Sequence, residues 1–257
     1  VIEGYVVTFD DVTDLVNAQR MAAWGDVAQR IAHEIKNPLT PIKLSAERLR
    51  HKFLPIAGEN EDSLTQYTDV IVRQTEDLRR IVDEFSKFAR MPKPERKSAD
   101  IIKLIEDVIY LETSRENQVS EIIFAKSDPL FATVDATMIT RCLTNLLKNA
   151  GEAIEAFISK FGKENYQPTI SINLENSKKE IIICISDNGI GLPKDRSRLF
   201  EPYVTTREKG TGLGLPIVKK IIEEHGGEFY LDDALRINND NHNGACALIK
   251  FRKSELE

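Results

Sequence analysis

The chain has 257 residues, 41% of them hydrophobic and 30% charged, and a net charge of −6 at pH 7. This balance gives no sign of the clustered basic surface that binds nucleic acid. A chain of this length can bury a core without disulfides or metal ions, so we expect one or two soluble globular domains and no nucleic-acid partner.

Three cysteines, Cys142, Cys184 and Cys246, lie far apart in the sequence among apolar neighbours. Because they form no Cys-x-x-Cys pair and no metal-ligand spacing, we expect small buried hydrophobic residues in a reducing compartment. No apolar run reaches the ~18 residues of a membrane span. Since the chain starts at Val1 without an initiator Met, we expect a cytoplasmic fragment that makes no direct membrane contact.

Two long helices are predicted in the first part of the chain. Apolar residues recur at spacings of three, four and seven over 14–53 and again over 62–90, with Pro55 and Gly58 in the loop between. The pattern predicts a helical hairpin. Two helices alone leave apolar surface exposed, so we expect a homodimer that closes a four-helix bundle. The proline-containing, charged stretch at 91–97 predicts a linker.

A different pattern follows the linker. Helical segments are predicted at 101–111, 136–161 and 217–224, and strands at 122–125, 169–174, 180–186, 228–231 and 245–251. Intermixed helices and strands with glycine-rich loops predict an α/β two-layer sandwich.

His33 is predicted to face solvent on the first helix. Ile31 and Ile35 share one helix face, which we expect to point inward, and His33 lies about 200° from each. An exposed imidazole beside Glu34 suits attack on a phosphoryl group, because the carboxylate can accept a proton from one ring nitrogen. Pro38 clashes with the carbonyl of Glu34 and predicts a bend there. For this pair in isolation, a solvated surface histidine is the simpler interpretation.

Two glycine-rich segments predict a nucleotide site. Asp-Asn-Gly-Ile-Gly at 187–191 follows a strand, where a carboxylate can accept a hydrogen bond from an exocyclic amine. A common turn is the simpler reading of this segment alone. Gly-Thr-Gly-Leu-Gly at 210–214 precedes a helix expected to open at Pro216, where free N–H groups and the helix dipole favour phosphate.

Asn145 and Asn149 are four residues apart and share one face of a predicted helix. Asparagine is a poor residue in the middle of a helix, so two on one face need a reason. Amide oxygens are suitable ligands for Mg²⁺, although a polar surface face would explain the pair as well.

In this order, the segments closely resemble the sensor histidine kinases, whose catalytic domain belongs to the ATPase superfamily shared with Hsp90, MutL and gyrase. The resemblance covers about residues 5–251. The matching motifs are the H box at 33–40, the N box at 145–150, the first glycine box at 187–191, the F box at 199–206 and the second glycine box at 210–214. It implies a GHKL-type ATP-binding fold, ATP as substrate and Mg²⁺ as its metal.

The resemblance implies a role for each matching residue. His33 would be the phospho-acceptor, Glu34 its orienting base, and Asn37 a residue that supports phosphatase activity. In the second domain Asn149 would bind Mg²⁺ with help from Asn145. The remaining nucleotide contacts would be Asp187 at the adenine amino group, Gly189, Gly191, Gly210, Thr211, Gly212, Leu213 and Gly214 around the pocket and its lid, and Arg207 or Lys209 at the γ-phosphate.

The resemblance also implies the domain order and the partner. Residues 1–13 would be the end of a PAS sensor domain, 14–92 the dimerisation and phosphotransfer hairpin, and 93–257 the catalytic domain. Because 18–50 is similar to the nitrogen-regulation branch of the family, we expect a response-regulator receiver domain of the NtrX type as partner. Full-length members are commonly anchored in the bacterial inner membrane.

Three alternatives remain open at this point. An ATPase that phosphorylates nothing is disfavoured by the exposed position of His33, and a non-enzymatic scaffold by the intact Asn149 and Asp187. A form biased towards phosphatase action fits the sequence as well. One departure from the family is Ala247, where the last motif usually carries an aromatic residue.

Overall fold

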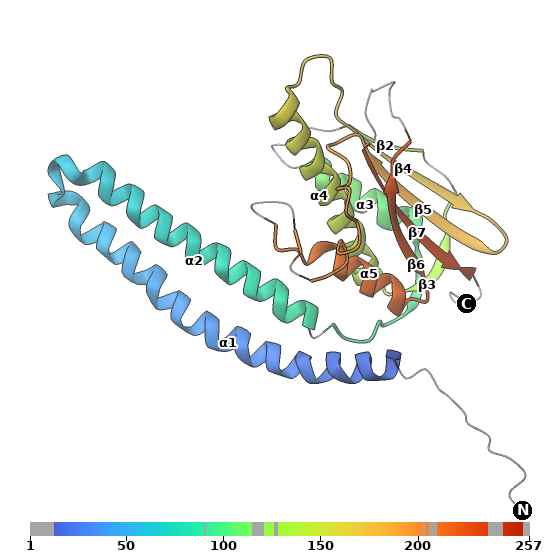
Figure 1. Cartoon of the computed structure of the whole chain (residues 1–257), viewed down its shortest axis with the longest axis horizontal. Helices are drawn as coiled ribbons and strands as arrows, with labels where there is room; N and C mark the ends of the chain where they lie inside the picture. Colours follow the sequence, from blue (N-terminus) through green and yellow to red (C-terminus); the bar gives the residue numbers. More distant parts are fainter. Residues whose placement is uncertain are drawn as a thin grey trace, which may run out of the picture. The chain divides into compact units, whose positions relative to one another are not determined.

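The computed structural model describes residues 13–89, 91–114, 121–125, 128–202, 204–205, 210–235 and 244–253, although not the side chains of 13–29 and 87–89. The chain divides into two compact units, Val1–Pro92 and Lys93–Glu257 (Figure 1). The strand expected at 4–9 lies outside the described residues. Within the described part of the chain, none of the helices combines the length and the apolar character needed to cross a membrane.

The first unit is a helical hairpin, as predicted. Helix α1 (Thr13–Phe53) and helix α2 (Glu61–Ala89) are joined by two short 3-10 turns, η1 (Leu54–Ile56) and η2 (Gly58–Asn60). Gly58 adopts a φ of 54°, a left-handed conformation that a residue with a side chain rarely takes. Helix α1 continues unbroken through Pro38 and Pro41, and Figure 1 shows a gently curved helix. The predicted bend at Pro38 therefore does not interrupt the helix.

The contact between the two helices is a heptad seam of small and medium side chains. The buried residues recur every seven positions on both helices: Ala32, Leu39 and Ala46 on α1, and Thr68, Thr75 and Val82 on α2. The hydroxyls of the two threonines donate to carbonyls of their own helix, as in Thr68 Oγ1 to Leu64 O at 2.8 Å, so they are buried without loss of hydrogen bonding.

The prediction that Ile31 and Ile35 face inward is wrong for the single chain. Their exposed fractions are 38% and 40%, and seven more large apolar residues of the hairpin are exposed as well: Ile42, Leu44 and Leu49 on α1, and Tyr67, Ile71, Leu78 and Ile81 on α2. The alanines and threonines of the seam allow the helices to approach closely, which turns the bulkier residues outward. The two helices of the hairpin thus leave a second apolar face uncovered.

Ion pairs between the two helices follow the same seven-residue repeat. Lys36, Lys43 and Arg50 on α1 pair with Asp83, Glu76 and Asp69 on α2, respectively, the last with 2.5 Å between Arg50 Nη1 and Asp69 Oδ1. Exposed pairs of this kind each contribute only about 0.2–1 kcal/mol. Their regular spacing, however, favours one register of α1 against α2.

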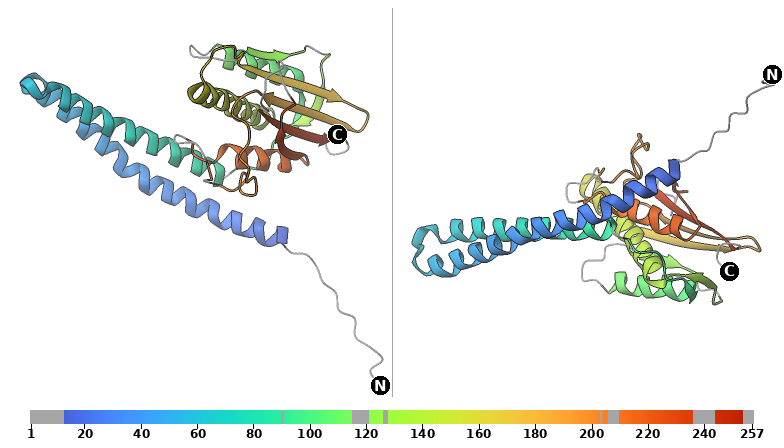
Figure 2. Two further views of the ribbon diagram at one scale, coloured as in Figure 1. Left: turned by 45° about the horizontal axis from the view of Figure 1, so that its top comes forward. Right: turned by 90° about the horizontal axis from the view of Figure 1, so that it is seen from below.

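The second unit is an α/β two-layer sandwich, as predicted. Its main sheet has the strand order β2 (Glu121–Phe124), β4 (Thr169–Asn176), β5 (Glu180–Asp187), β7 (Ala245–Arg252) and β6 (Glu228–Asp233). Only the β2–β4 pair is parallel. Helices α3 (Ile101–Thr113), α4 (Ala136–Phe161) and α5 (Gly214–Glu224) lie against one face of this sheet (Figure 2).

Alternating side chains on the strands build the core beneath these helices. Ile181, Ile183 and Ile185 of β5 are almost completely buried, as are Ile249 and Phe251 of β7. The residues between them, such as Ile182 and Cys184, point to the opposite face and are partly exposed. This period of two fixes the register, because a slip by one residue would turn the isoleucines out of the core.

A small antiparallel ribbon was not predicted. Strands β1 (Lys97–Asp100) and β3 (Phe131–Val134) pair along their whole length. The β1 sequence, Lys-Ser-Ala-Asp, has no apolar alternation, so only its pairing with β3 marks it as a strand. The Asp100 carboxylate accepts from the N–H groups of Ile102 and Leu130, which caps α3 and ties β1 to the segment before β3.

Candidate functional site

The hairpin presents His33 to solvent. Glu34 and Asn37 are exposed as well, and His33 and Asn37 lie one helical turn apart on one face of α1. On the neighbouring side, Lys36 is held by Asp83 of α2. The structure therefore leaves the imidazole accessible to a reactant, as the spacing predicted.

Helix α4 carries both candidate asparagines, and its start is well defined. Asp135 is the N-cap, with Oδ1 accepting from Met138 N–H at 3.1 Å and Oδ2 from Glu95 N–H at 2.9 Å. Burial is the largest single influence on this carboxyl and favours its neutral form, but the donated N–H groups together hold the Asp135 pKa below its ordinary value. Asn145 and Asn149 follow on one face of α4, both half-buried.

The first glycine box is held in place by a buried asparagine. Asn188 Oδ1 accepts from Thr169 N–H at 2.9 Å and from the Tyr166 hydroxyl at 3.0 Å, and its Nδ2 donates to Gln167 O at 2.8 Å. Within this motif Asn188 thus has a structural role.

Asp187, the residue before it, is the last residue of strand β5. Asp187 is only 5% exposed, and its Oδ1 accepts from Gly189 N–H at 2.8 Å and Ala245 N–H at 3.4 Å.

Gly189 permits close packing of this loop on α4. A Cβ at Gly189 would lie 2.5 Å from the carbonyl carbon of Ala153, and Ile190 N–H donates to Ala153 O at 3.0 Å. Gly191 has a φ of 76°, which also favours glycine. Gly189 is therefore required for the close approach of the loop to the backbone of α4. From the sequence we predicted only a role for Gly189 at the nucleotide pocket, not this packing role.

The second glycine box meets the same helix one turn earlier. A Cβ at Gly214 would lie 3.6 Å from Nδ2 and 3.7 Å from Oδ1 of Asn149. Gly212 has a φ of 66°, Leu213 is fully buried, and α5 begins at Gly214, two residues before the predicted start at Pro216. Gly210 and Thr211 lead into this turn, and the Thr211 hydroxyl lies 3.4 Å from Leu213 N.

These contacts bring three separate sequence motifs together. The first glycine box rests on α4 at Ala153, and the second lies beside Asn149, four residues earlier on the same helix. The Asp187 carboxylate, the side-chain amides of Asn145 and Asn149, and the glycine turn before α5 therefore lie along one stretch of α4. Such a set can bind a ligand that combines an amino-substituted ring with phosphates.

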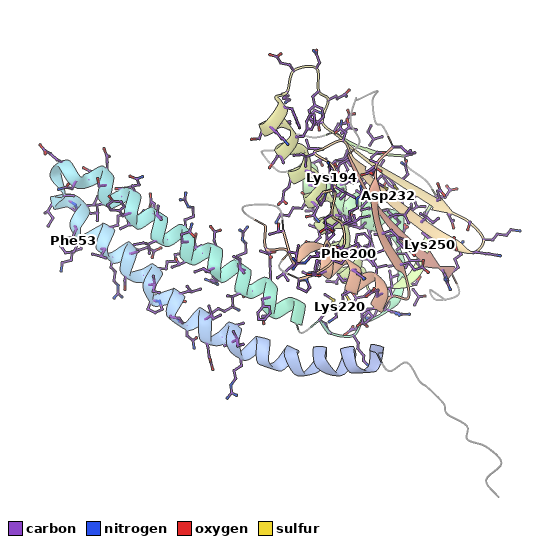
Figure 3. All side chains as sticks on the ribbon, viewed as in Figure 1. Phe53, Lys194, Phe200, Lys220, Asp232 and Lys250 are labelled. Carbon is purple, nitrogen blue, oxygen red and sulfur yellow. The ribbon has the colours of Figure 1, made fainter. Side chains whose placement is uncertain are left out.

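The F box packs near this cluster through Phe200. Its ring makes an edge contact with Phe229 of β6 at 5.7 Å between centroids, and Lys219 of α5 lies over the ring at 5.1 Å. Phe200 is labelled in Figure 3, in the segment before α5. Arg207 and Lys209, the predicted γ-phosphate contacts, lie outside the described residues.

His225 connects the two helices of the nucleotide cluster, and the sequence did not predict this role. The residue is fully buried at the end of α5, with Nδ1 donating to Ile221 O at 2.7 Å and Nε2 accepting from Asp135 N–H at 3.0 Å. Because an amide N–H can only donate, Nε2 must be the acceptor, and the ring is neutral with its proton on Nδ1. The neutral tautomer joins the end of α5 to the start of α4.

The end of the linker is tied to the same place. Arg96 donates to Glu224 O at 2.7 Å, and Glu95 N–H donates to Asp135 as described above. Both bonds lie within the second unit. The last residues of the predicted linker 91–97 are therefore tied to the second unit.

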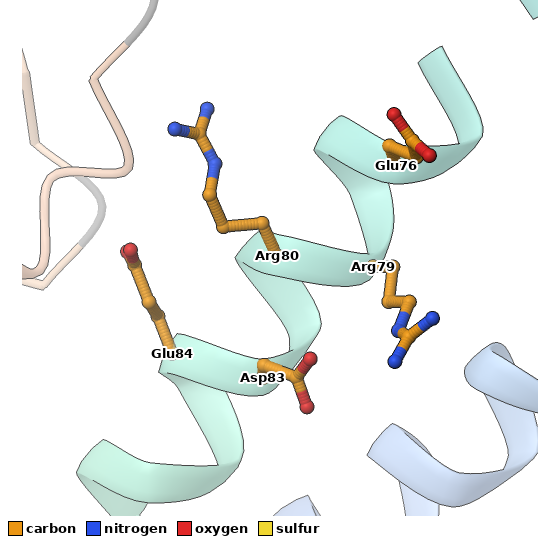
Figure 4. A pocket seen from close by; sticks show the side chains of 5 residues that line it. All are labelled: Glu76, Arg79, Arg80, Asp83 and Glu84. Atoms are coloured by element: carbon orange, nitrogen blue, oxygen red, sulfur yellow. The ribbon is translucent and has the colours of Figure 1, made fainter. Parts of the chain in front are cut away.

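One surface hollow lies on α2 and is unrelated to this cluster. It is lined by Glu76, Arg79, Arg80, Asp83 and Glu84 (Figure 4). Two of these carboxylates already pair with lysines of α1. A shallow hollow lined only by charged side chains lacks the apolar walls of a typical small-molecule site.

Comparison with known families agrees with this class of site. The His Kinase A (phospho-acceptor) domain matches residues 23–94, and the histidine kinase-, DNA gyrase B- and HSP90-like ATPase family matches residues 134–255. The first match contains the exposed histidine, and the second contains the glycine and asparagine motifs. The chain belongs to the sensor histidine kinases, whose phospho-acceptor and ATPase domains it contains.

Two curated relatives are similar to most of this chain. It is 50% identical over 234 residues to the nitrogen regulation protein NtrY of Azorhizobium caulinodans, an alignment that covers 90% of this chain. It is also 41% identical to an NtrY-like sensor histidine kinase of Rickettsia bellii over 95% of this chain. The chain spans 30% and 38% of the length of these two relatives, respectively.

Two solved structures share the fold. Histidine kinase ThkA, in complex with response regulator protein TrrA, aligns over 96% of this chain and 69% of its own, with 26% identity and a TM-score of 0.59. Full-length ShkA in complex with AMPPNP aligns over 88% of this chain and 45% of its own, with 22% identity and a TM-score of 0.64.

Proposed function

We propose that this chain is a kinase core that transfers the γ-phosphoryl group of ATP to His33 and then to an aspartate of a response-regulator receiver domain. The observation that carries the proposal is the meeting of the Asp187 loop and the Gly210–Gly214 turn on one stretch of α4, in a chain whose hairpin presents His33 to solvent. The A. caulinodans relative is a nitrogen regulation protein, and the ThkA structure contains a response regulator.

In this proposal Asp187 recognises the adenine ring. Two N–H groups hold its Oδ1 and so fix the direction of the carboxylate in a largely buried position. A fixed carboxylate accepts a hydrogen bond from the exocyclic amine of adenine and discriminates against guanine, which has a carbonyl there. The turn at 210–214 and the first N–H groups of α5 then lie at the phosphate end, where the helix dipole favours negative charge.

The asparagines of α4 fit a magnesium ion. The Asn149 amide lies beside Gly214, the first residue of α5, and Asn145 lies one turn earlier on the same face of α4. Asn149, assisted by Asn145, would hold Mg²⁺, which neutralises charge on the phosphates of bound ATP.

On the hairpin, His33 acts as the nucleophile. Glu34 accepts a proton from one ring nitrogen and leaves the other ready for in-line attack. Phosphoryl transfer needs little else from the protein besides alignment and charge neutralisation. Asn37, on the same helix face, orients a water molecule towards the aspartyl phosphate of the regulator, which makes the protein a phosphatase as well.

The uncovered apolar face of the hairpin supports a homodimer. Ile31, Ile35 and Ile42 on α1 and Ile71 and Leu78 on α2 remain exposed in the single chain. A second hairpin would bury them in a four-helix bundle. The receiver partner is of the NtrX type, and the full-length protein is anchored in the bacterial inner membrane.

The phosphorylation test uses γ-labelled ATP with Mg²⁺. We expect wild type to acquire an acid-labile, base-stable label and His33→Gln to acquire none. His51→Gln is the matched control, because His51 is another exposed histidine of α1 and its replacement leaves the label intact. An unlabelled wild type that still binds ATP would favour an ATPase or a phosphatase-biased form.

The phosphatase test begins with a phosphorylated receiver domain. We expect Asn37→Ala to slow its dephosphorylation while leaving His33 labelling intact, because the amide acts only on the water. Ser45→Ala, at another exposed position of α1, is the control. Equal dephosphorylation by Asn37→Ala and wild type would remove Asn37 from the mechanism.

A further inference from the structure

Two cysteines that are 62 residues apart in the sequence meet on the main sheet. Cys184 lies on β5 and Cys246 on β7, and their sulfur atoms are 2.6 Å apart. Both are half-buried, on the face of the sheet opposite the helices. The expectation of small buried hydrophobic residues is therefore wrong for this half-buried pair and holds for Cys142, which is fully buried in α4.

The strand register explains why the two side chains meet. Cys184 lies opposite Leu248, and Ser186 lies opposite Cys246, so the two cysteines are diagonal neighbours on one face of an antiparallel pair. Diagonal neighbours can touch across the strands, and strand twist shortens one of the two diagonals. The contact is thus a consequence of the core register that buries Ile183 and Ile185.

The surroundings of the pair favour a thiolate. The hydrogen bond from the Cys246 thiol lowers the pKa of Cys184 to about 6, against the opposing effect of burial, and the Ser186 hydroxyl lowers it further. The same contact raises the pKa of Cys246. Burial raises the pKa of Cys142 well above its ordinary value. Since the thiolate is the nucleophile in disulfide exchange, we expect Cys184 to be the attacking thiol and the buried Cys142 to be unreactive.

We propose that Cys184 and Cys246 form a redox-active thiol pair that closes to an intramolecular disulfide when the chain meets a low-molecular-mass disulfide. With oxidised glutathione, the Cys184 thiolate attacks one sulfur, breaks the glutathione S–S bond and releases one glutathione. Cys246 then loses its proton, attacks the Cys184 sulfur of the mixed disulfide and releases the second glutathione. Two protein thiols lose two electrons in total, and one glutathione disulfide is reduced to two thiols.

The bond would form close to the adenine end of the nucleotide cluster. Asp187 is three residues after Cys184 on β5, and its Oδ1 faces the N–H of Ala245, the residue before Cys246. The neighbouring backbone is tightly packed, since a Cβ at Gly244 would lie 1.8 Å from Asp187 O. Any shift of β7 against β5 at the cysteines is therefore transmitted to Asp187.

A disulfide brings the two sulfur atoms closer still, from 2.6 Å to the bond length of about 2.05 Å, and fixes their geometry. Closing the bond draws this diagonal together and weakens the Ala245–Asp187 contact. The expected consequence is an approximately three- to tenfold loss of ATP affinity, the range for one hydrogen bond. This consequence, unlike the disulfide itself, rests on the proposed role of Asp187.

The experiment exposes the intact chain to a graded series of reduced and oxidised glutathione, then unfolds it in denaturant, blocks all free thiols with N-ethylmaleimide and measures the mass. The reduced protein takes up three labels, one for each cysteine in the sequence. We expect the oxidised wild type and the Cys142→Ala control to lose two labels and 2 Da of mass, with a peptide that links Cys184 to Cys246. Cys184→Ser and Cys246→Ser should form no internal bond.

Binding of an ATP analogue is then measured on the oxidised and reduced forms. We expect the loss of affinity in wild type and in Cys142→Ala, its reversal by dithiothreitol, and no change in Cys246→Ser. Three labelled thiols throughout the series, or a bond that involves Cys142 or a second chain, would overturn the redox pair. A Cys184–Cys246 bond with unchanged affinity would overturn its coupling to the nucleotide cluster and leave the proposed kinase function untouched.

Discussion

The hairpin and the ATPase unit bury their apolar residues in different ways. In the second unit the core-facing isoleucines, such as Ile181, Ile183 and Ile185 of β5 and Ile221 and Ile222 of α5, are almost fully enclosed. Among the described side chains of the hairpin, a narrow seam of alanine, threonine, leucine and valine is buried, and most of the large apolar ones face outward. The second unit therefore has a core of its own, whereas the hairpin leaves apolar side chains for another surface to cover in the proposed dimer.

The largest expected effect is at Gly244 in the enclosed unit. A Cβ there would lie 1.8 Å from Asp187 O, so Gly244→Ala must push β7 away from β5. We expect the free energy of unfolding of this unit to fall by about 3 kcal/mol, the upper end of ordinary overpacking. Hydrogen exchange of the β5 amides measures it without interference from the hairpin.

Gly151 provides the contrast for that substitution. It lies within α4, and a Cβ there would meet nothing within 4 Å. Gly151→Ala should therefore stabilise the unit by about 0.5–1 kcal/mol, because alanine loses less backbone entropy in a helix. Equal exchange rates in the Gly244→Ala protein and wild type would contradict the packing described between β5 and β7.

His225 tests whether the enclosed unit depends on its buried polar links. His225→Leu leaves Asp135 N–H without its acceptor in a part-buried position. We expect the free energy of unfolding to fall by about 2 kcal/mol, within the cost of an unsatisfied buried donor. Exchange should rise most at the start of α4 and the end of α5. A uniform change across the unit would count against a specific link.

The uncovered face of the hairpin is tested at Ile42, which is 46% exposed in the single chain. Ile42→Glu places a charge where a second hairpin would bury an isoleucine. We expect the dimer dissociation constant to rise at least about tenfold, since burying this side chain is worth about 1.5–3 kcal/mol. Sedimentation over a concentration series measures it.

Arg48→Glu is the matched control, because it introduces the same residue at an exposed position on another side of α1. It should leave the dissociation constant within a few-fold of wild type. If both variants dissociate equally, the loss comes from charge and not from the apolar face.

The smallest expected effect concerns the cap of α4. The pKa of Asp135 is lowered in the folded chain, so its contribution to stability is present above the unfolded value and is lost as pH falls through the folded pKa. At pH 7 we expect Asp135→Asn to cost about 0.3–1 kcal/mol, the usual range for a charge at a helix N-terminus. Urea unfolding followed by hydrogen exchange at α4 should show this difference shrinking towards pH 3, and a constant difference would contradict the charged cap.

The sequence predicted those parts of the fold that local chemistry marks clearly. Helix α4 begins after Asp135 and ends before Gly162, and these two residues signal its predicted bounds. Strands β4 and β5 were predicted from their β-branched runs. Strand β1 was missed because Lys97–Asp100 is polar and becomes a strand only through pairing with β3.

What the sequence could not provide was contact between distant segments. The alanines and threonines that form the contact between α1 and α2 are too small or too polar to stand out as a hydrophobic stripe in the sequence. The larger isoleucines of α1 were therefore predicted to face α2 in their place. The meeting of Cys184 with Cys246 depends on the register of β5 and β7. The pairing of His225 with Asp135 depends on how α5 packs beside α4. The glycine, asparagine and histidine motifs were found because each has a local spacing, whereas the clustering of the nucleotide motifs on α4 needed the fold.

The most direct test of the division between the two units measures ATP binding and His33 phosphorylation side by side in two variants. We predict that His33→Gln binds ATP as wild type does but acquires no label, because its change lies wholly in the hairpin. Asp187→Asn should lose both ATP affinity and label, because its change lies in the nucleotide cluster. A His33→Gln protein that keeps its acid-labile label, or an Asp187→Asn protein that binds ATP and phosphorylates as wild type does, would contradict the account.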